Sequence, residues 1–138
     1  MTTTQQAPAP KAGDSVSFRK TMTVAEQAMF TGISGNLGGL YVDRSKAHTL
    51  GFPDMAVFEL AAAALLSTCL SRLAGPGYRM AGFRVGFERT IVIGTTVEAT
   101  ATLASVDRER LVCALSLAAD GAPFASGEAI LAPAAAEN

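Results

Sequence analysis

Regular alternation of apolar and polar residues is the main pattern in the second half of the chain. It is clearest where apolar residues occupy every second position, at Val97, Ala99, Ala101 and Leu103. A period of two is typical of a β-strand that turns one face to a core. Similar strand patterns, separated by turn residues such as Asp120-Gly121, cover five segments: 78–87, 90–92, 95–107, 111–119 and 122–131. They predict an antiparallel sheet with one face packed on a helix.

One more strand and a helix are predicted before this sheet. The strand covers residues 15–22, where four alternate residues share a mostly apolar face: Val16, Phe18, Lys20 and Met22. The helix opens with a capping box, Thr23-Val24-Ala25-Glu26, in which the hydroxyl and the carboxylate satisfy free N–H groups reciprocally. We therefore interpret Glu26 as a cap and not as a catalyst. The helix is expected to stop at Gly32 and to turn four residues to the core: Val24, Ala28, Phe30 and Ile33.

A long helix is predicted over residues 53–74, and the sheet is expected to wrap around it. Ala and Leu occur on all sides of this segment, as they do in a buried helix. Pro53 suits a first helical turn, and Asp54 suits the positive end of the helix dipole. A short polar helix is predicted over residues 43–50, with Asp43 as its N-cap and Gly51 as its terminating residue.

The ends of the chain differ from its centre in composition. Residues 1–13 are mainly Thr, Gln, Ala and Pro, which bury too little surface to offset the entropy of ordering. We expect a disordered N-terminal tail over residues 1–13, a single α+β domain over residues 14–133, and a frayed C-terminus over residues 134–138.

Charge and cysteine usage exclude several classes of function. The formal net charge is −1 and the basic residues are scattered, so no nucleic-acid partner is expected. The two cysteines, Cys69 and Cys113, fall in apolar segments and predict buried free thiols in a reducing cytoplasm. His48 is the only histidine, so no histidine metal cluster is possible, and we interpret it as a surface residue. The longest apolar run is far shorter than the roughly 20 residues that span a membrane.

A glycine-rich stretch, SGNLGGLYVD at positions 34–43, is the main candidate for chemistry. Three glycines in five positions allow the backbone to come close to a ligand. Together with the two helices that follow, this stretch resembles the centre of MaoC-like (R)-specific enoyl-thioester hydratases, which have a hot dog fold. Those enzymes carry the pattern Ser-Gly-Asp-x-Asn-Pro-x-His-x-Asp here. Four positions match it: Ser34, Gly35, Leu40 and Asp43.

The resemblance also implies a site, with altered catalytic residues. Asn36 stands where the family has its catalytic Asp, and Tyr41 stands where it has its catalytic His. Asn36 can orient a water molecule but cannot take its proton, whereas Tyr41 can donate a proton. Glu59, at the start of the long helix, is the third catalytic candidate, because acidic residues on this helix act in several hot dog thioesterases. The alternative is that Glu59 faces solvent or pairs with an arginine, since carboxylates near helix starts are common for dipole reasons alone. Six further residues are expected to bind substrate: Ser34, Gly35, Gly38, Gly39, Phe58 and Leu60.

The resemblance leaves three functions open. The favoured one is a lyase that hydrates an enoyl thioester or dehydrates a 3-hydroxyacyl thioester, with Asn36, Tyr41 and Glu59 as its site. The others are an acyl-CoA thioesterase that uses Glu59, and a non-catalytic hot dog subunit of a dehydratase complex. The family implies a coenzyme A or carrier-protein thioester as substrate, no cofactor, and a homodimer, a higher oligomer or a complex with a hot dog partner subunit.

Overall fold

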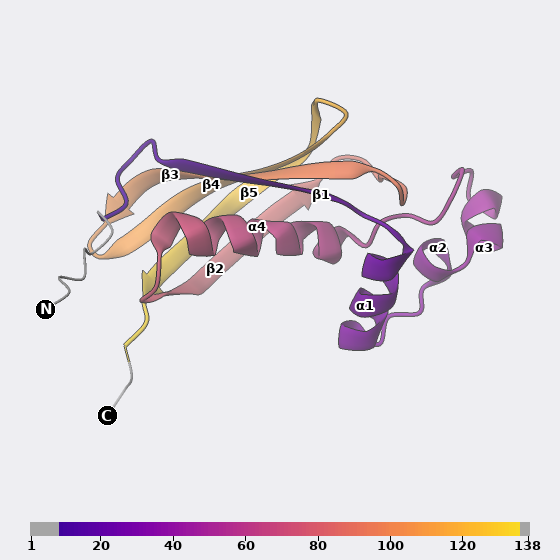
Figure 1. The fold of residues 1–138 in the computed structure, drawn as a ribbon, viewed down its shortest axis with the longest axis horizontal. Coiled ribbons are helices and arrows are strands. Elements are labelled where there is room, and N and C mark those ends of the chain that lie inside the picture. Colours follow the sequence, from indigo (N-terminus) through magenta and orange to yellow (C-terminus); the bar gives the residue numbers. More distant parts are fainter. Residues whose placement is uncertain (1–8, 136–138) are drawn as a thin grey trace, which may run out of the picture.

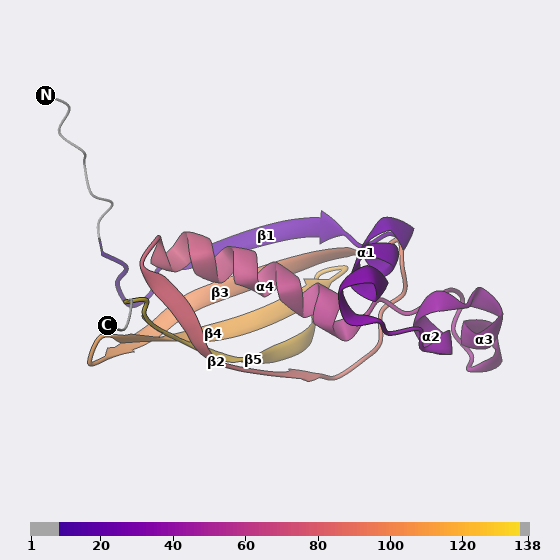
Figure 2. The same ribbon diagram turned by 90° about the horizontal axis from the view of Figure 1, so that it is seen from below.

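Within residues 9–135, a five-stranded antiparallel sheet arches over one long helix, and three shorter helices lie beyond one end of both (Figures 1 and 2). The structure is a computed structural model, and it describes residues 9–135. The disorder predicted for residues 1–8 and the fraying predicted for residues 136–138 lie outside the described residues. Among the described residues, Gly13 donates its N–H to Leu103 at 2.8 Å, and Ala134 donates to Gly77 at 2.7 Å.

The strands lie side by side in the order β1-β3-β4-β5-β2 across the sheet. Their bounds are β1 Ser15–Thr21, β2 Tyr78–Phe87, β3 Thr96–Asp107, β4 Arg110–Ala119 and β5 Ala122–Pro133. Each agrees with the predicted segment to within two residues, because alternation identifies strands well when one face is buried. The segment 90–92 is an exception. It forms no strand, and only Val92 pairs there, in an isolated bridge with Ala56.

The long helix, α4 (Glu59–Ala74), lies along the inner face of the sheet (Figure 2). Its buried residues include Leu66, Cys69 and Leu70, and they pack against inward-facing strand residues such as Val97 and Leu117 in one apolar core. Both cysteines are free and buried, as predicted. Among residues 9–135, none of the helices combines the length and the apolar character that a membrane crossing requires.

The predicted start of the long helix at Pro53 is wrong. Residues 53–58 are not helical: they bend at 53 and 54 and continue as an extended segment through the β-bridge residue Ala56, and the helix begins only at Glu59. The N–H of Val57 donates to Ile91 at 2.9 Å, and that of Ile93 donates to Met55 at 3.0 Å. Because these backbone groups already have distant partners, the helical signals of Pro53 and Asp54 are overridden. The prediction that α4 is buried on all sides is also wrong, since Leu60 is 65 % exposed.

The first helix, α1 (Val24–Ser34), begins at the predicted capping box but continues through Gly32. It ends at Gly35, which has φ 74°, a left-handed conformation that favours glycine. The predicted core face was largely wrong. Val24 and Ile33 are 55 % and 82 % exposed, whereas the polar Gln27 is only 4 % exposed.

Two short helices follow. α3 (Arg44–Thr49) forms where a short helix was predicted, and the Asp43 carboxylate caps it by accepting the N–H of Lys46 at 3.2 Å. α2 (Gly39–Val42), a single turn, was not predicted from the sequence. This turn places Tyr41 where its side chain reaches Glu59 at the start of α4.

Candidate active site

The candidate site lies at the N-terminal end of α4, where α1, α2 and the extended segment 53–58 meet (Figure 1). Its central contact is a hydrogen bond in which the Tyr41 hydroxyl donates to Oε1 of Glu59 at 2.6 Å. The Tyr41 ring stacks on Phe58 with centroids 4.5 Å apart and an interplanar angle of 15°. Phe58, which directly precedes Glu59, therefore packs against the ring of Tyr41, and the hydroxyl of Tyr41 bonds to Glu59. Two of the three predicted catalytic residues are in direct contact.

The Tyr41 hydroxyl is held in its protonated form. Burial is the largest cause, and the neighbouring Glu59 carboxylate adds to it, so that the pKa of Tyr41 is raised to about 12. Both effects disfavour a negative charge on the phenol oxygen. At neutral pH Tyr41 is consequently a proton donor and not a base, and the acceptor in this pair is Glu59.

Asn36 has a different environment from the other two. Its side-chain Oδ1 accepts the N–H of Gly38 at 2.8 Å, which forms a local turn. Its own N–H donates to the Ser34 hydroxyl at 3.1 Å, and that hydroxyl donates to Phe30 at 2.7 Å. Ser34 and Asn36 thus shape the loop after α1. The side-chain nitrogen Nδ2 of Asn36 takes no part in this turn.

The glycines in this loop fit the residues around them closely. A Cβ on Gly38 would lie 3.1 Å from Oδ1 of Asn36 and 3.3 Å from Cδ2 of Tyr41, so Gly38 separates these two predicted catalytic residues. A Cβ on Gly39 would lie 2.5 Å from Cδ of Lys46. A side chain at Gly38 would require Asn36 or Tyr41 to shift slightly, whereas one at Gly39 would displace the flexible Lys46 side chain.

Phe58 and Leu60, predicted to bind substrate, have contrasting surroundings. Phe58 is 2 % exposed, and its ring packs against Tyr41 and Phe30, so its side chain supports the site from within the core. Leu60 points outward beside Met80 and Phe83, where it lines an apolar hollow. Among residues 9–135, neither the N–H of Glu59 nor that of Leu60 has an acceptor. These N–H groups at the start of α4 can receive a developing negative charge.

Sequence reasoning missed Gln27, which bonds both to Tyr41 in α2 and to the segment that leads into α4. Its Nε2 donates to the backbone oxygens of Tyr41 at 2.7 Å and Ala56 at 2.8 Å. Its Oε1 accepts the N–H of Phe58 at 3.3 Å. The amphipathic pattern of α1 provided no signal, because a glutamine after a capping box is expected to face solvent.

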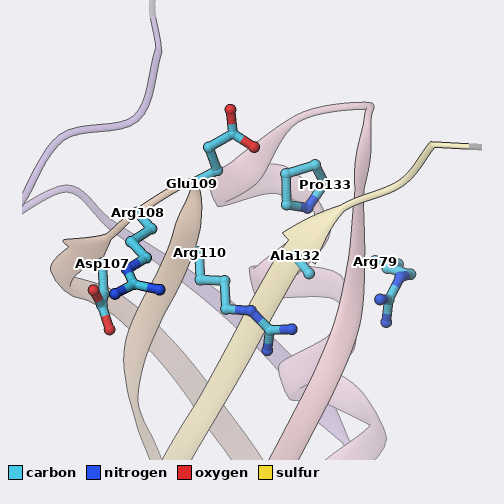
Figure 3. A pocket seen from close by; sticks show the side chains of 7 residues that line it. All are labelled: Arg79, Asp107, Arg108, Glu109, Arg110, Ala132 and Pro133. Atoms are coloured by element: carbon cyan, nitrogen blue, oxygen red, sulfur yellow. The ribbon is translucent and has the colours of Figure 1, made fainter.

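Two hollows differ in their relation to these residues. One of about 270 Å³ adjoins Tyr41 and is mostly apolar, with a lining that includes Val24, Ala28, Leu37 and Met55. A larger one of about 660 Å³ lies at the far end of the sheet, around the turn between β3 and β4 (Figure 3). Exposed side chains such as Arg79 and Arg110 line the larger hollow. Although large pockets are the usual candidates for a site, this one holds none of the predicted residues. No group of His, Cys, Asp and Glu suited to a metal ion occurs in the described part of the chain.

Comparison with solved structures assigns the fold. The (R)-hydratase from A. caviae involved in PHA biosynthesis superimposes with a TM-score of 0.87 and 23 % identity, over 93 % of this chain and 100 % of that one. The ChsH1–ChsH2 complex from Mycobacterium tuberculosis matches with a TM-score of 0.81 and 14 % identity, over 90 % of this chain and 98 % of that one. The fold is accordingly the predicted hot dog fold.

Sequence comparison then assigns the family. No protein-family model matches the chain. An (R)-specific enoyl-CoA hydratase from Rhodospirillum rubrum, however, is 30 % identical over 101 residues, which are 72 % of this chain and 70 % of the relative. The chain belongs to the family of MaoC-like (R)-specific enoyl-CoA hydratases, as its central motif indicated.

Proposed function

We propose that the protein is a lyase that adds water to an enoyl thioester, or removes it from a 3-hydroxyacyl thioester, with Glu59 as base and Tyr41 as acid. The hydrogen bond of 2.6 Å between these two side chains carries the proposal. It joins a protonated donor to a carboxylate that can accept a proton, which are the two functions that hydration requires. The acyl group would be carried by coenzyme A or by a carrier protein, and no cofactor is needed.

The proposed steps balance in protons and electrons. Glu59 takes a proton from water while the water oxygen bonds to C3, and the C2–C3 π pair moves toward C2 and the thioester carbonyl. The N–H groups of Glu59 and Leu60 stabilise the charge on the carbonyl oxygen. Tyr41 gives its proton to C2, and the proton on Glu59 then passes to the Tyr41 oxygen. Asn36 is proposed to orient the water through its amide, with Gly38 leaving space between Asn36 and Tyr41.

The test is an assay of purified protein with crotonyl-CoA and longer 2-enoyl-CoAs that follows loss of the enoyl absorbance and release of thiol together. Hydration predicts loss of the enoyl signal without thiol. Tyr41→Phe and Glu59→Gln should each lower kcat/KM by about 10²- to 10⁴-fold, the usual contribution of a positioned acid or base. Tyr78→Phe, which removes the only other phenol hydroxyl, is the matched control and should have little effect. Full activity in Tyr41→Phe would refute this mechanism, and thiol release would identify a thioesterase.

A second function, a non-catalytic subunit of a dehydratase complex, is favoured by the state of Asn36. Its Oδ1 is already engaged by Gly38, and an amide cannot take a proton from water. In support, one of the structural neighbours is itself a complex of two chains, ChsH1 and ChsH2. This function predicts no turnover by the protein alone and activity when a second hot dog chain that carries an Asp and a His is added.

Either function is proposed to involve association of subunits. β2 is an edge strand, and Leu60, Met80 and Phe83 leave an exposed apolar surface beside it, with exposures of 65 %, 44 % and 38 %. An edge strand next to an apolar patch is a favourable place for another chain to pair. We propose a homodimer through this surface. Sedimentation should give twice the monomer mass for the wild type and the monomer mass for Phe83→Lys.

A further inference from the structure

Gln27 is unusual because it is the only polar residue in the core of the described residues. A buried amide costs free energy unless its donors and acceptor find partners. Gln27 satisfies that requirement entirely with backbone groups of residues 41–58, a segment distant in sequence. These three hydrogen bonds explain why a polar side chain is buried at this position.

The partners of Gln27 include the backbones of both aromatic residues in the site. One amide hydrogen reaches the oxygen of Tyr41 at 2.7 Å, and the side-chain oxygen receives the N–H of Phe58 at 3.3 Å. The rings of these two residues stack on each other, and Glu59 follows Phe58 directly. One carboxamide thus fixes α2 relative to the first residues of α4.

We infer that Gln27 is a positioning residue that holds the Tyr41 hydroxyl against Glu59. The inference rests on the proposed function for its catalytic meaning, but the geometry it concerns can be measured without substrate. An apolar side chain of similar size would leave three backbone groups without partners, two of them buried and one half-buried, and the segment would move to pair them elsewhere. In the described part of the chain, one other hydrogen bond joins α2 to the extended segment. The N–H of Ala56 donates to the backbone oxygen of Leu40 at 3.0 Å.

The ionisation of Tyr41 reports this geometry directly. The chain has two tyrosines and no tryptophan, so in a Tyr78→Phe background the tyrosinate absorbance belongs to Tyr41 alone. After a rapid jump to about pH 11, read before any unfolding, a phenol with a pKa of about 12 is roughly one tenth ionised, whereas one with an ordinary pKa of about 10 is roughly nine tenths ionised.

The experiment compares three substitutions in that background. Gln27→Met should raise the tyrosinate fraction from about one tenth to more than about one half, because the hydroxyl leaves Glu59 and meets solvent. Gln27→Asn, whose shorter amide can still bond one of these backbone groups at any pH, should give an intermediate fraction and serves if Gln27→Met does not fold. Cys113→Ala, a buried substitution in β4, controls for simple loss of stability and should leave the fraction unchanged.

Two further results distinguish a failure of this inference from a failure of the proposed function. If the protein turns over enoyl-CoA, Gln27→Met should lower kcat about tenfold or more with little change in KM, since it displaces the acid without touching the acyl group. If the wild type is inactive, the tyrosinate measurement still decides whether Gln27 holds Tyr41. A tyrosinate fraction that Gln27→Met leaves at the wild-type value would overturn the inference, and so would an equal rise in Cys113→Ala.

Discussion

Two regions of the molecule are stabilised in different ways. The body, which consists of the sheet and α4, is held by apolar side chains that alternate along the strands and pack on the helix. The excursion, residues 23–58, contributes a few core residues such as Phe58 but is also held by polar side chains that bond backbone atoms: Gln27, Ser34, Asn36 and Asp43. Tyr41 and Asn36 lie in the excursion, and Glu59 lies where it joins the body. Global stability therefore belongs mainly to the body and the proposed chemistry to the excursion.

The largest expected effect is in the body, at Gly127. A Cβ there would overlap the backbone carbonyl of Arg84 on the neighbouring strand. Gly127→Ala should cost more than about 4 kcal/mol, enough to unfold a domain of ordinary stability. Urea unfolding and circular dichroism would measure this. Gly86→Ala, on β2 where a Cβ meets open space, should stay near the wild type, and equal effects of the two changes would argue against this strand register.

A smaller loss is expected from the helix that fills the body. Leu66 is fully buried at 0 % exposure, and Leu66→Ala removes its packing and leaves a cavity. The free energy of unfolding should fall by about 2–5 kcal/mol. Leu60→Ala on the same helix, where the side chain is 65 % exposed in the single chain, should change it by less than about 1 kcal/mol when both variants are made in the monomeric Phe83→Lys background. Similar losses in both variants in that background would mean that the outward face of α4 is covered within the chain itself.

The same division explains what the sequence could predict. Strand bounds such as those of β4 follow from alternation, which is a direct consequence of burying one face. The start of α4 could not be predicted, because Val57 bonds to Ile91, which is 34 residues away, and no local signal reports such a partner. The catalytic candidates came from a motif resemblance. Only the fold shows that Tyr41 and Glu59, 18 residues apart, meet through a hydrogen bond.

Gln27 marks the limit of pattern reasoning in the excursion. Its polar side chain is buried, while the apolar Val24 and Ile33 on the same helix are exposed. Hydrophobic periodicity assumes that the core side of a helix is apolar, and here the core side faces backbone groups that need hydrogen bonds. A helix that covers another backbone segment can thus invert the expected pattern.

The next prediction concerns pH and the capping box of the excursion. The Glu26 carboxylate accepts the N–H of Thr23 at 2.7 Å, and its pKa is lowered from 4.5 to about 2, chiefly by hydrogen bonding to the Thr23 side chain. The folded state therefore binds fewer protons than the unfolded state. The stability from Glu26 is fully present above about pH 4.5 and is lost as the pH falls toward 2.

Glu26→Gln should consequently cost about 0.5–1 kcal/mol at neutral pH, a modest value because the carboxylate is partly exposed. Unfolding curves at several pH values should show the difference between wild type and variant shrinking below about pH 4.5. A difference that stays constant down to pH 2 would assign the loss to packing and not to charge.

The last prediction compares Gly32, which lies inside α1, with Gly35, its C-cap, where effects of similar size and opposite sign are expected. Gly32 lies inside the helix, and a Cβ there meets nothing within 4 Å, so Gly32→Ala should raise the free energy of unfolding by about 0.5–1 kcal/mol through helix propensity. Gly35 ends the helix at φ 74°, and Gly35→Ala should lower stability by about 1 kcal/mol, because alanine is strained in that conformation. Hydrogen exchange of the α1 amides would show slower opening in the first variant and faster opening in the second. A loss of stability in Gly32→Ala would instead place the end of α1 at Gly32, where the sequence predicted it, and would argue against the turn that presents Asn36.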